Sequence, residues 1–264
     1  MATFSLGWRF LEACAKAKGV PMKTQTKSEN KSAKATKTKT QTQRGKPFSI
    51  YFAGDLWSHK DLIGNAILAD YIDKVSAGRY QCVLPQNLEQ STNRSVDIRN
   101  QDLKQVMTCD MAIFNFDGSE LDSGTVVEFM YAKMLDVPCV ILRTDFRSSG
   151  EGGRDQDPWN LMATHWPRTR VLKFNGMAEY QGSRVPGPLA RTIEKLYRKM
   201  SAQIIESLDE VRKDKPLIRN AAQLATLFDW AVESPGAGYG ELFSKGEVQQ
   251  VLAAKMAKGL LAAS

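Results

Sequence analysis

The chain passes from a strand to a helix in the stretch Phe114-Asn-Phe-Asp-Gly-Ser-Glu-Leu-Asp-Ser-Gly-Thr-Val-Val-Glu-Phe-Met-Tyr-Ala132. An apolar run that favours β structure ends in acidic and glycine residues, and a helical pattern begins at Gly124-Thr125. In a parallel α/β sheet, ligands bind at this kind of junction, beyond the carboxyl ends of the strands. The stretch therefore predicts a binding site beside the start of a helix.

Two carboxylates of this junction, Asp122 and Glu128, are candidates for chemistry. We expect Asp122 to lie beside the pocket and Glu128 to project from the first helical turns. There the helix dipole and the free N–H groups hold a carboxylate ionised, as a nucleophile requires. The structural alternative is that Asp122 and Ser123 only cap the helix and that Glu128 is a favourable acid near its start.

Short β-rich runs alternate with segments of helical periodicity on both sides of this stretch. We expect strands at 48–54, 81–85, 111–116, 138–142 and 169–174, and helices at 61–75, 96–109, 125–135 and 189–211. This alternation predicts an α/β fold with a doubly wound, parallel five-stranded sheet of flavodoxin-like or Rossmann-like order. Extra C-terminal helices are predicted at 217–233 and 246–262, and the sequence leaves open whether they pack on the sheet or on another subunit.

The basic charge of the chain is concentrated near its N-terminus. Residues 23–46 hold seven lysines and one arginine against one glutamate, a surplus equal to the formal net charge of +7 of the whole chain. Because they contain no aliphatic side chain larger than alanine, they cannot bury enough surface to offset their conformational entropy. We interpret 1–46 as a mostly disordered tail, with nucleic-acid contact as the less favoured alternative. The α/β domain is then expected at 47–188 and a C-terminal helical extension at 189–264.

Composition excludes several classes of protein. A hydrophobic content of 42% supports a real core, and no uninterrupted apolar run reaches the roughly 18 residues of a membrane span. The cysteines are widely spaced, which is typical of reduced thiols in a cytoplasmic protein. They are Cys14, Cys82, Cys109 and Cys139.

Cofactor and metal motifs are missing from the sequence. No Gly-x-Gly-x-x-Gly follows the first predicted strand, because Gly54 stands alone there and Gly150, Gly152 and Gly153 follow the fourth strand within a loop. The only histidines, His59 and His165, are expected at the surface, too few for a zinc cluster or a Ser-His-Asp triad with any redundancy. We therefore expect neither a cofactor nor a metal ion.

Four segments resemble the motifs of the nucleoside 2-deoxyribosyltransferases, in the same order. They are Ile50-Tyr-Phe-Ala-Gly54, Asn100-Gln-Asp-Leu103, Asp122-Ser-Gly-Thr-Val-Val-Glu128 and Trp159-Asn-Leu-Met162, within about 47–174. The resemblance implies a flavodoxin-like sheet and a cytoplasmic salvage enzyme that acts on 2′-deoxynucleosides and free nucleobases. Such an enzyme moves 2-deoxyribose from one base to another.

The resemblance also implies roles for three residues. Glu128 matches the nucleophile that attacks the anomeric carbon and forms a covalent ester, which a second base then displaces with retention, as in retaining glycosidases. Tyr51 matches the tyrosine that positions this nucleophile, and Asp102 matches the acid that meets the base. From the residues alone, Tyr51 could equally pack in the core, and Asp102 is an ordinary exposed helix acid.

The substrate-binding residues implied by the resemblance come from several loops. Asp122 matches the residue that holds sugar hydroxyls, and Gln86 and Asn87 lie in the region that reads the base edge. Asn160 and Met162 match a segment that reaches into a neighbouring subunit, which implies a homo-oligomer with shared active sites. Their simpler interpretation is a loop in which the asparagine turns the chain and the methionine fills a gap.

Two other functions use the same residues. A hydrolase would take water as the acceptor and cleave deoxynucleosides or their monophosphates, with the phosphate near Gly54 and Ser123-Gly124. A nucleotide-binding module would keep the pocket without the chemistry, although the intact set of Asp102, Asp122 and Glu128 argues against it. The long glycine-rich loop 146–157 is interpreted as a lid.

Overall fold

The computed structural model describes residues 46–88, 94–147 and 157–262. Its sheet has five parallel strands in the order β2-β1-β3-β4-β5. The strands are β1 (Phe48–Ala53), β2 (Tyr80–Val83), β3 (Met111–Asn115), β4 (Cys139–Arg143) and β5 (Thr169–Lys173). The α/β fold is confirmed, and of the two orders expected this is the flavodoxin-like one. Its topological switch point lies between β1 and β3.

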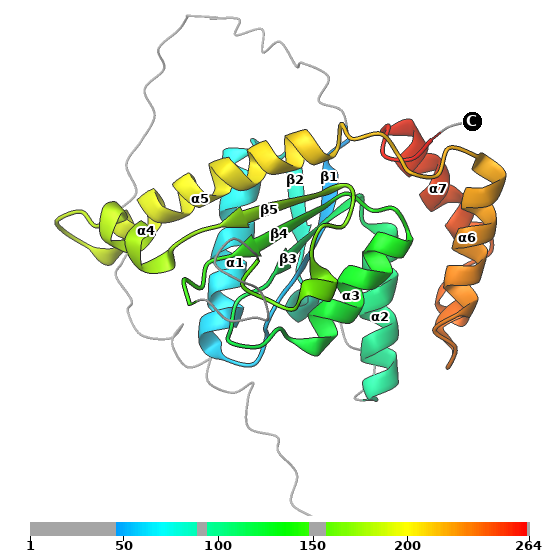
Figure 1. The fold of residues 1–264 in the computed structure, drawn as a ribbon, viewed down its shortest axis with the longest axis horizontal. Helices are drawn as coiled ribbons and strands as arrows, with labels where there is room; N and C mark the ends of the chain where they lie inside the picture. The colour runs from blue at the N-terminus through cyan, green and yellow to red at the C-terminus, as the bar shows by residue number, and fades with distance from the viewer. Residues whose placement is uncertain (1–45, 89–93, 148–156, 263–264) are drawn as a thin grey trace, which may run out of the picture. The chain divides into compact units, whose positions relative to one another are not determined.

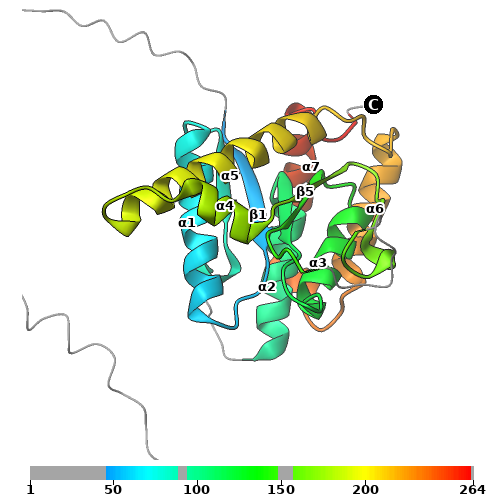
Figure 2. The same cartoon turned by 60° about the vertical axis from the view of Figure 1, so that its left-hand side comes forward.

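Helices cover both faces of the sheet (Figures 1 and 2). They are α1 (His59–Val75), α2 (Ser95–Thr108), α3 (Ser123–Met134), α4 (Gly176–Ser183), α5 (Leu189–Val211), α6 (Ala221–Glu233) and α7 (Glu247–Ala257), with short 3-10 turns η1 (Pro85–Asn87), η2 (Leu161–Ala163) and η3 (Tyr239–Leu242). Helices α1 and α5 pack on one face, and α2 and α3 on the other. Among the α-helices of the described residues, only α4 had not been predicted, because its eight largely exposed residues carry no clear apolar stripe.

Strand β1 sends alternate side chains to the two faces. Ile50 and Phe52 join the core under α1 and α5, whereas Tyr51 and Ala53 join the core under α2 and α3. Tyr51 pairs in register with Ala112 of β3 and is fully buried. It lies inside the strand, and its side chain faces the two helices expected to carry the chemistry.

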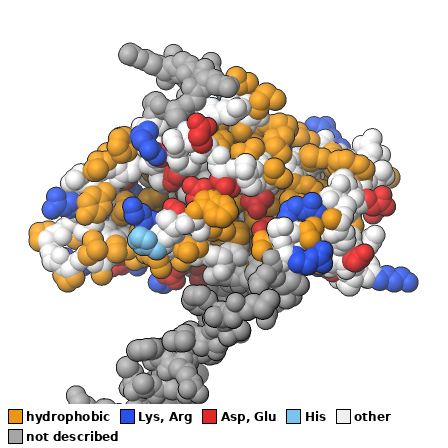
Figure 3. Space-filling model, turned by 90° about the horizontal axis from the view of Figure 1, so that it is seen from below, with side chains coloured by type: hydrophobic (Ala, Val, Ile, Leu, Met, Phe, Trp, Pro, Cys, Tyr) orange, Lys and Arg blue, Asp and Glu red, His pale blue; other side chains and the backbone are white. Residues whose placement is uncertain are grey.

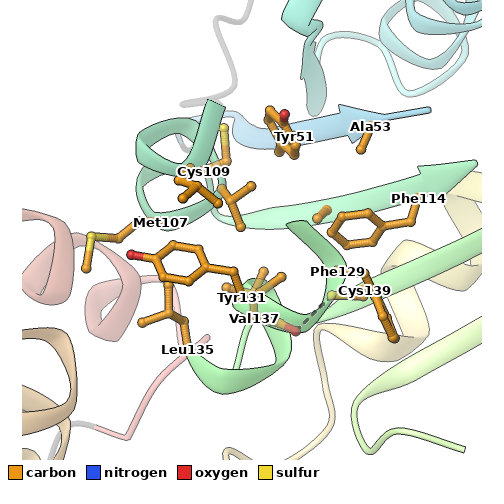
Figure 4. Packing of buried hydrophobic residues seen from close by; sticks show 14 of the residues in the cluster. Tyr51, Ala53, Met107, Cys109, Phe114, Phe129, Tyr131, Leu135, Val137 and Cys139 are labelled. Atoms are coloured by element: carbon orange, nitrogen blue, oxygen red, sulfur yellow. Dashed lines mark hydrogen bonds between the residues drawn. The ribbon is translucent and has the colours of Figure 1, made fainter. Parts of the chain in front are cut away.

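The C-terminal helices pack on the same chain, against α2 and α3. Their apolar residues Leu224, Phe228, Val248 and Leu252 belong to one buried cluster with Met107 of α2. Figure 4 shows part of this cluster, with the Tyr131 hydroxyl on the Met107 side, away from Phe114 and Ala53 of the sheet. The question that the sequence left open is thus answered for the described residues. None of the described helices is long and apolar enough to cross a membrane.

Candidate active site

The site lies at the carboxyl edge of β1 and β3. Helix α3 begins there because Asp122 caps it: the Asp122 carboxylate accepts hydrogen bonds from the Thr125 N–H at 2.7 Å and the Thr125 hydroxyl at 2.9 Å. Seen from below, acidic side chains gather near the middle of the face in Figure 3. At this edge, burial raises the pKa of Asp55, and Asp122 and Asp117 lie close enough to raise it further.

A hydrogen bond joins Tyr51 to Glu128. The Tyr51 hydroxyl donates to Oε1 of Glu128 at 2.7 Å, from the middle of β1 to the second turn of α3. Burial raises the pKa of Tyr51 well above its ordinary value, and the nearby charges of Glu128 and Asp102 add to the effect. Tyr51 therefore stays protonated and acts as a hydrogen-bond donor. Tyr51 therefore packs in the core and also contacts Glu128.

The helix start does not hold Glu128 in its ionised form, contrary to the expectation from the sequence. Burial raises its pKa to about 8; the hydrogen bond from Tyr51 lowers it, and the charges of Asp102 and Asp122 raise it further. The expectation was wrong because Glu128 lies beyond the first helical turn, where backbone N–H groups already bond within the helix. Desolvation outweighs the single neutral donor.

Asp102 is not the exposed helix acid that its residue type suggested. It lies half-buried on α2, and its Oδ1 is buried with no hydrogen-bond partner in the part of the chain that the structure describes. Burial raises its pKa to about 6. Because the charge of Asp102 raises the pKa of both Tyr51 and Glu128, the fold brings these three groups, from three different elements, into one site.

The cap residue of α3, Asp122, also lies near the other carboxylates. It caps α3, and its charge reaches Glu128. Its Oδ1 also accepts a hydrogen bond from the indole of Trp57 at 3.3 Å, although Trp57 is 83% exposed. Sequence reasoning missed Trp57, and the available signal was an aromatic residue in the loop directly after the first strand. The neighbouring Ser123 and Gly124 are exposed, and a Cβ on Gly124 would lie 3.1 Å from Oδ2 of Asp122.

The other residues predicted to bind substrate, Gly54, Gln86 and Asn87, lie in the segments that follow β1 and β2. A Cβ on Gly54 would lie 2.9 Å from Cβ of Asn115, so a glycine lets the loop after β1 approach β3. Gln86 donates to the Leu62 carbonyl of α1 at 2.8 Å, and Asn87 is exposed. Within the described residues, no hydrogen bond joins Gln86 or Asn87 to the carboxylates.

Asn160 and Met162 lie on the other side of α3 from Glu128. The Asn160 side chain accepts a hydrogen bond from the Met162 N–H at 2.9 Å, and Met162 is 72% exposed. With Ser123 and Trp159 they line a cavity of about 800 Å³, whose lining does not include Tyr51, Asp102 or Glu128. One copy of the chain therefore does not bring η2 to the carboxylates.

Further acids surround the loop after β1 and were missed by sequence reasoning. Burial raises the pKa of Asp55, and the charges of Asp122, Asp61 and Asp117 raise it further. Asp117 accepts hydrogen bonds from the N–H and hydroxyl groups of Thr144 at 2.5 and 2.6 Å. Four acids therefore lie close together beside the loop after β1. No group of three or more His, Cys, Asp or Glu side chains among the described residues could hold a metal ion.

Some of the predictions concern residues outside the described ranges, and others concern the exposure of histidines and cysteines. The tail, Cys14 and most of the proposed lid, with Gly150, Gly152 and Gly153, lie outside the described ranges. His59 and His165 are exposed, as expected. Cys82, Cys109 and Cys139 are free thiols; Cys82 is half-buried and the other two are buried.

Comparison with known proteins identifies the matching region. The family model described as nucleoside 2-deoxyribosyltransferase matches residues 50–162, which contain Tyr51, Asp102, Asp122 and Glu128. This confirms the resemblance drawn from the four motifs. No curated protein matches the chain.

Solved structures are similar to part of the chain. A 2-deoxyribosyltransferase from Leishmania mexicana is 24% identical, with a TM-score of 0.38 over 47% of this chain and 90% of that chain. One from Bacillus psychrosaccharolyticus is 14% identical, with a TM-score of 0.37 over 55% and 95%. A CMP N-glycosidase from Clostridium botulinum is 13% identical, with a TM-score of 0.32 over 51% and 95%. The relation to the family therefore rests on the match over residues 50–162 and not on these structures.

Proposed function

We propose that this protein, whose residues 50–162 match the nucleoside 2-deoxyribosyltransferase family, transfers 2-deoxyribose between nucleobases through a covalent ester on Glu128. The observation that carries the proposal is the 2.7 Å hydrogen bond from Tyr51 to Glu128, with the half-buried Asp102 electrostatically coupled to both. A nucleophile, a residue that orients it and a carboxylic acid for the leaving base are the groups that this reaction requires.

The first half-reaction forms the ester. An oxygen of ionised Glu128 attacks the anomeric carbon while the bond from that carbon to the base nitrogen breaks, and the base takes its electron pair and a proton from Asp102. In the second half-reaction a new base attacks the same carbon, the ester bond breaks, and the proton of the new base passes to Asp102. Two inversions retain the configuration. The Tyr51 hydroxyl orients Glu128 throughout.

Both carboxyls have raised pKa values, so the pair can hold a proton near neutral pH. Burial brings the pKa of Asp102 to about 6 and that of Glu128 to about 8. Between these values the pair holds one proton, mainly on Glu128, and the reactive arrangement is the minor one, in which the proton is on Asp102 and Glu128 is ionised. Because the two groups interact, the titration belongs to the pair rather than to either residue.

The acids around the loop after β1 favour a nucleoside over its 5′-monophosphate. Asp55, Asp117 and Asp122 repel a phosphate, and Asp122 already occupies an N–H group at the start of α3 that would otherwise bind one. Hydrolysis of a nucleotide, the alternative function, therefore has less support than transfer between nucleosides.

We also propose that the protein forms a homo-oligomer in which η2 of one copy completes the site of another. The support is the exposed apolar surface of this region, where Val127, Leu161 and Met162 are 58%, 52% and 72% exposed. Light scattering of the wild type and of Met162→Asp tests this: a monomeric wild type contradicts the proposal, and dissociation of the variant with loss of transfer supports it.

The deciding experiment incubates the protein with deoxyinosine and free adenine. New deoxyadenosine means transfer, free deoxyribose means hydrolysis, and no change means a binding module. A parallel incubation with deoxyinosine 5′-monophosphate tests the discrimination against phosphate. Glu128→Gln is the matched control for contaminating enzymes. Faster turnover of the monophosphate, or release of free deoxyribose alone, would replace the proposal with the hydrolase.

A further inference from the structure

The C-terminal segment forms hydrogen bonds and an ion pair with α2, the helix that carries Asp102. The amide of Asn100, which is 3% exposed, donates to the Ala237 carbonyl at 3.0 Å. Lys104 donates to the Leu242 carbonyl at 2.7 Å and forms an ion pair with Glu247 of α7 at 2.6 Å. Asn100 and Lys104 lie two residues before and after Asp102, on the other side of α2, so the helix is fixed from its back face.

The same segment forms hydrogen bonds with α3, the helix that carries Glu128. The Tyr131 hydroxyl, one turn further along α3, donates to the Ala231 carbonyl of α6 at 2.9 Å. It also lies 3.1 Å from the Tyr239 hydroxyl, and Tyr239 is fully buried. Buried hydroxyl pairs of this kind hold their elements in one arrangement. Both helices are thus attached to the segment that begins at α6.

We propose that the segment Ala221–Ala257, which lies outside the family match, positions α2 and α3 so that Asp102 and Glu128 stay close together. The inference rests on the proposed function, and it makes Asn100, Lys104, Tyr131 and Tyr239 positioning residues rather than catalytic ones. A domain that ended after α5 would leave the outer faces of α2 and α3 uncovered. The segment therefore fixes the relative positions of the two helices that carry the acid and the nucleophile.

The ion pair between Lys104 and Glu247 allows a test by charge exchange. Lys104→Glu and Glu247→Lys each break the pair, and the double variant restores it in reverse. We expect each single variant to lower the transfer rate by roughly three- to tenfold, and the double variant to recover most of the loss. The ion pair between Lys199 and Glu179, at 2.6 Å between α5 and α4, is the matched control, and its reversal leaves the rate unchanged.

The titration of Asp102 separates positioning from a direct effect of charge. Asp102 is coupled to Glu128 of α3 and to Tyr51 of β1, while Lys104 lies on the far side of its own helix. A loosened α2 lets water reach Asp102, so its pKa falls in both single variants. A direct field effect instead raises the pKa in Lys104→Glu and lowers it in Glu247→Lys.

The measurement is carboxyl-carbon NMR of the full-length protein across pH, with the Asp102 signal assigned by Asp102→Asn. It requires no turnover, so it stands even if the proposed function fails and the wild type transfers nothing. A fall of the Asp102 pKa in both single variants, with recovery in the double variant, supports the proposal. Opposite shifts, or none, overturn it. Tyr131→Phe removes both hydroxyl contacts of α3 with the ring retained, and an unchanged Glu128 titration there removes α3 from the proposal.

Discussion

The Tyr51 hydroxyl donates a 2.7 Å hydrogen bond to Glu128, which lies 77 positions further along the chain. This bond stabilises the ionised form of a carboxyl that burial otherwise keeps protonated. The donor is neutral, so it lowers the pKa of Glu128 only in part. The balance between one hydrogen bond and desolvation therefore sets how much of the nucleophile is available near neutral pH.

Replacing Tyr51 by phenylalanine removes the donor and keeps the ring in the core. Because the hydroxyl lowers the pKa of Glu128, its loss raises that pKa, and the share of ionised nucleophile falls. We expect transfer to slow by roughly 10- to 100-fold, as for the loss of a hydrogen bond to a charged group. The upper limb of the pH–rate profile should move to higher pH. An upper limb that stays in place contradicts this role for Tyr51.

Replacing Glu128 by glutamine should abolish transfer and leave the fold intact. The variant also tests burial. A carboxyl with a pKa of about 8 when folded and 4.5 when unfolded binds more protons in the folded chain, so stability falls as pH rises through this window. The glutamine variant lacks this loss. Its advantage in free energy of unfolding should grow by on the order of 1–3 kcal/mol between pH 5 and pH 8, measured by urea denaturation.

The pH–rate profile of the wild type should be bell-shaped, with limbs near pH 6 and pH 8. Burial places the pKa of Asp102 at about 6 and that of Glu128 at about 8, and the reaction needs the pair to hold one proton. Below the lower limb Glu128 is neutral, and above the upper limb Asp102 has no proton to give. Initial rates of deoxyadenosine formation across pH 4.5–9.5 check this, and a rate that is flat from pH 5 to pH 9 rules it out.

Replacing Asp102 by asparagine keeps the shape of the side chain but removes the acid. The base must then leave with more negative charge, so transfer should slow by roughly 10²–10⁴-fold, most for poor leaving bases. Turnover of two deoxynucleosides whose bases differ in basicity measures this. Equal rates for wild type and variant on both substrates would mean that Asp102 has no catalytic role, while the case for Glu128 would stand.

Deleting residues 1–46 should leave the specific activity unchanged. The prediction comes from composition, since residues 23–46 are rich in lysine and threonine and contain no aliphatic side chain larger than alanine, and we interpret 1–46 as a mostly disordered tail. Transfer by the truncated and full-length proteins at equal concentration measures it. A large loss of turnover would assign the tail a part in the reaction.

Apart from α4, the sequence alone was enough to predict the succession of strands and helices along the chain. Short apolar runs such as Val140-Ile141-Leu142 read as buried parallel strands, and helix 189–211 was predicted to its last residue, because its apolar stripe repeats over six turns. The cap at Asp122 is also local, because it joins residues three positions apart, and each of the four motifs in the family resemblance is a short run of residues.

Only the tertiary structure decided the protonation of the carboxyls in the site. The pKa values of Asp102 and Glu128 depend on how much water the packed helices exclude and on charges from other elements, which no spacing along the chain records. The position of α6 and α7 was likewise open, since an apolar helix face shows that something covers it but not what. Packing against Tyr131 and Met107 answers this, because those residues present the complementary buried surface on the same chain.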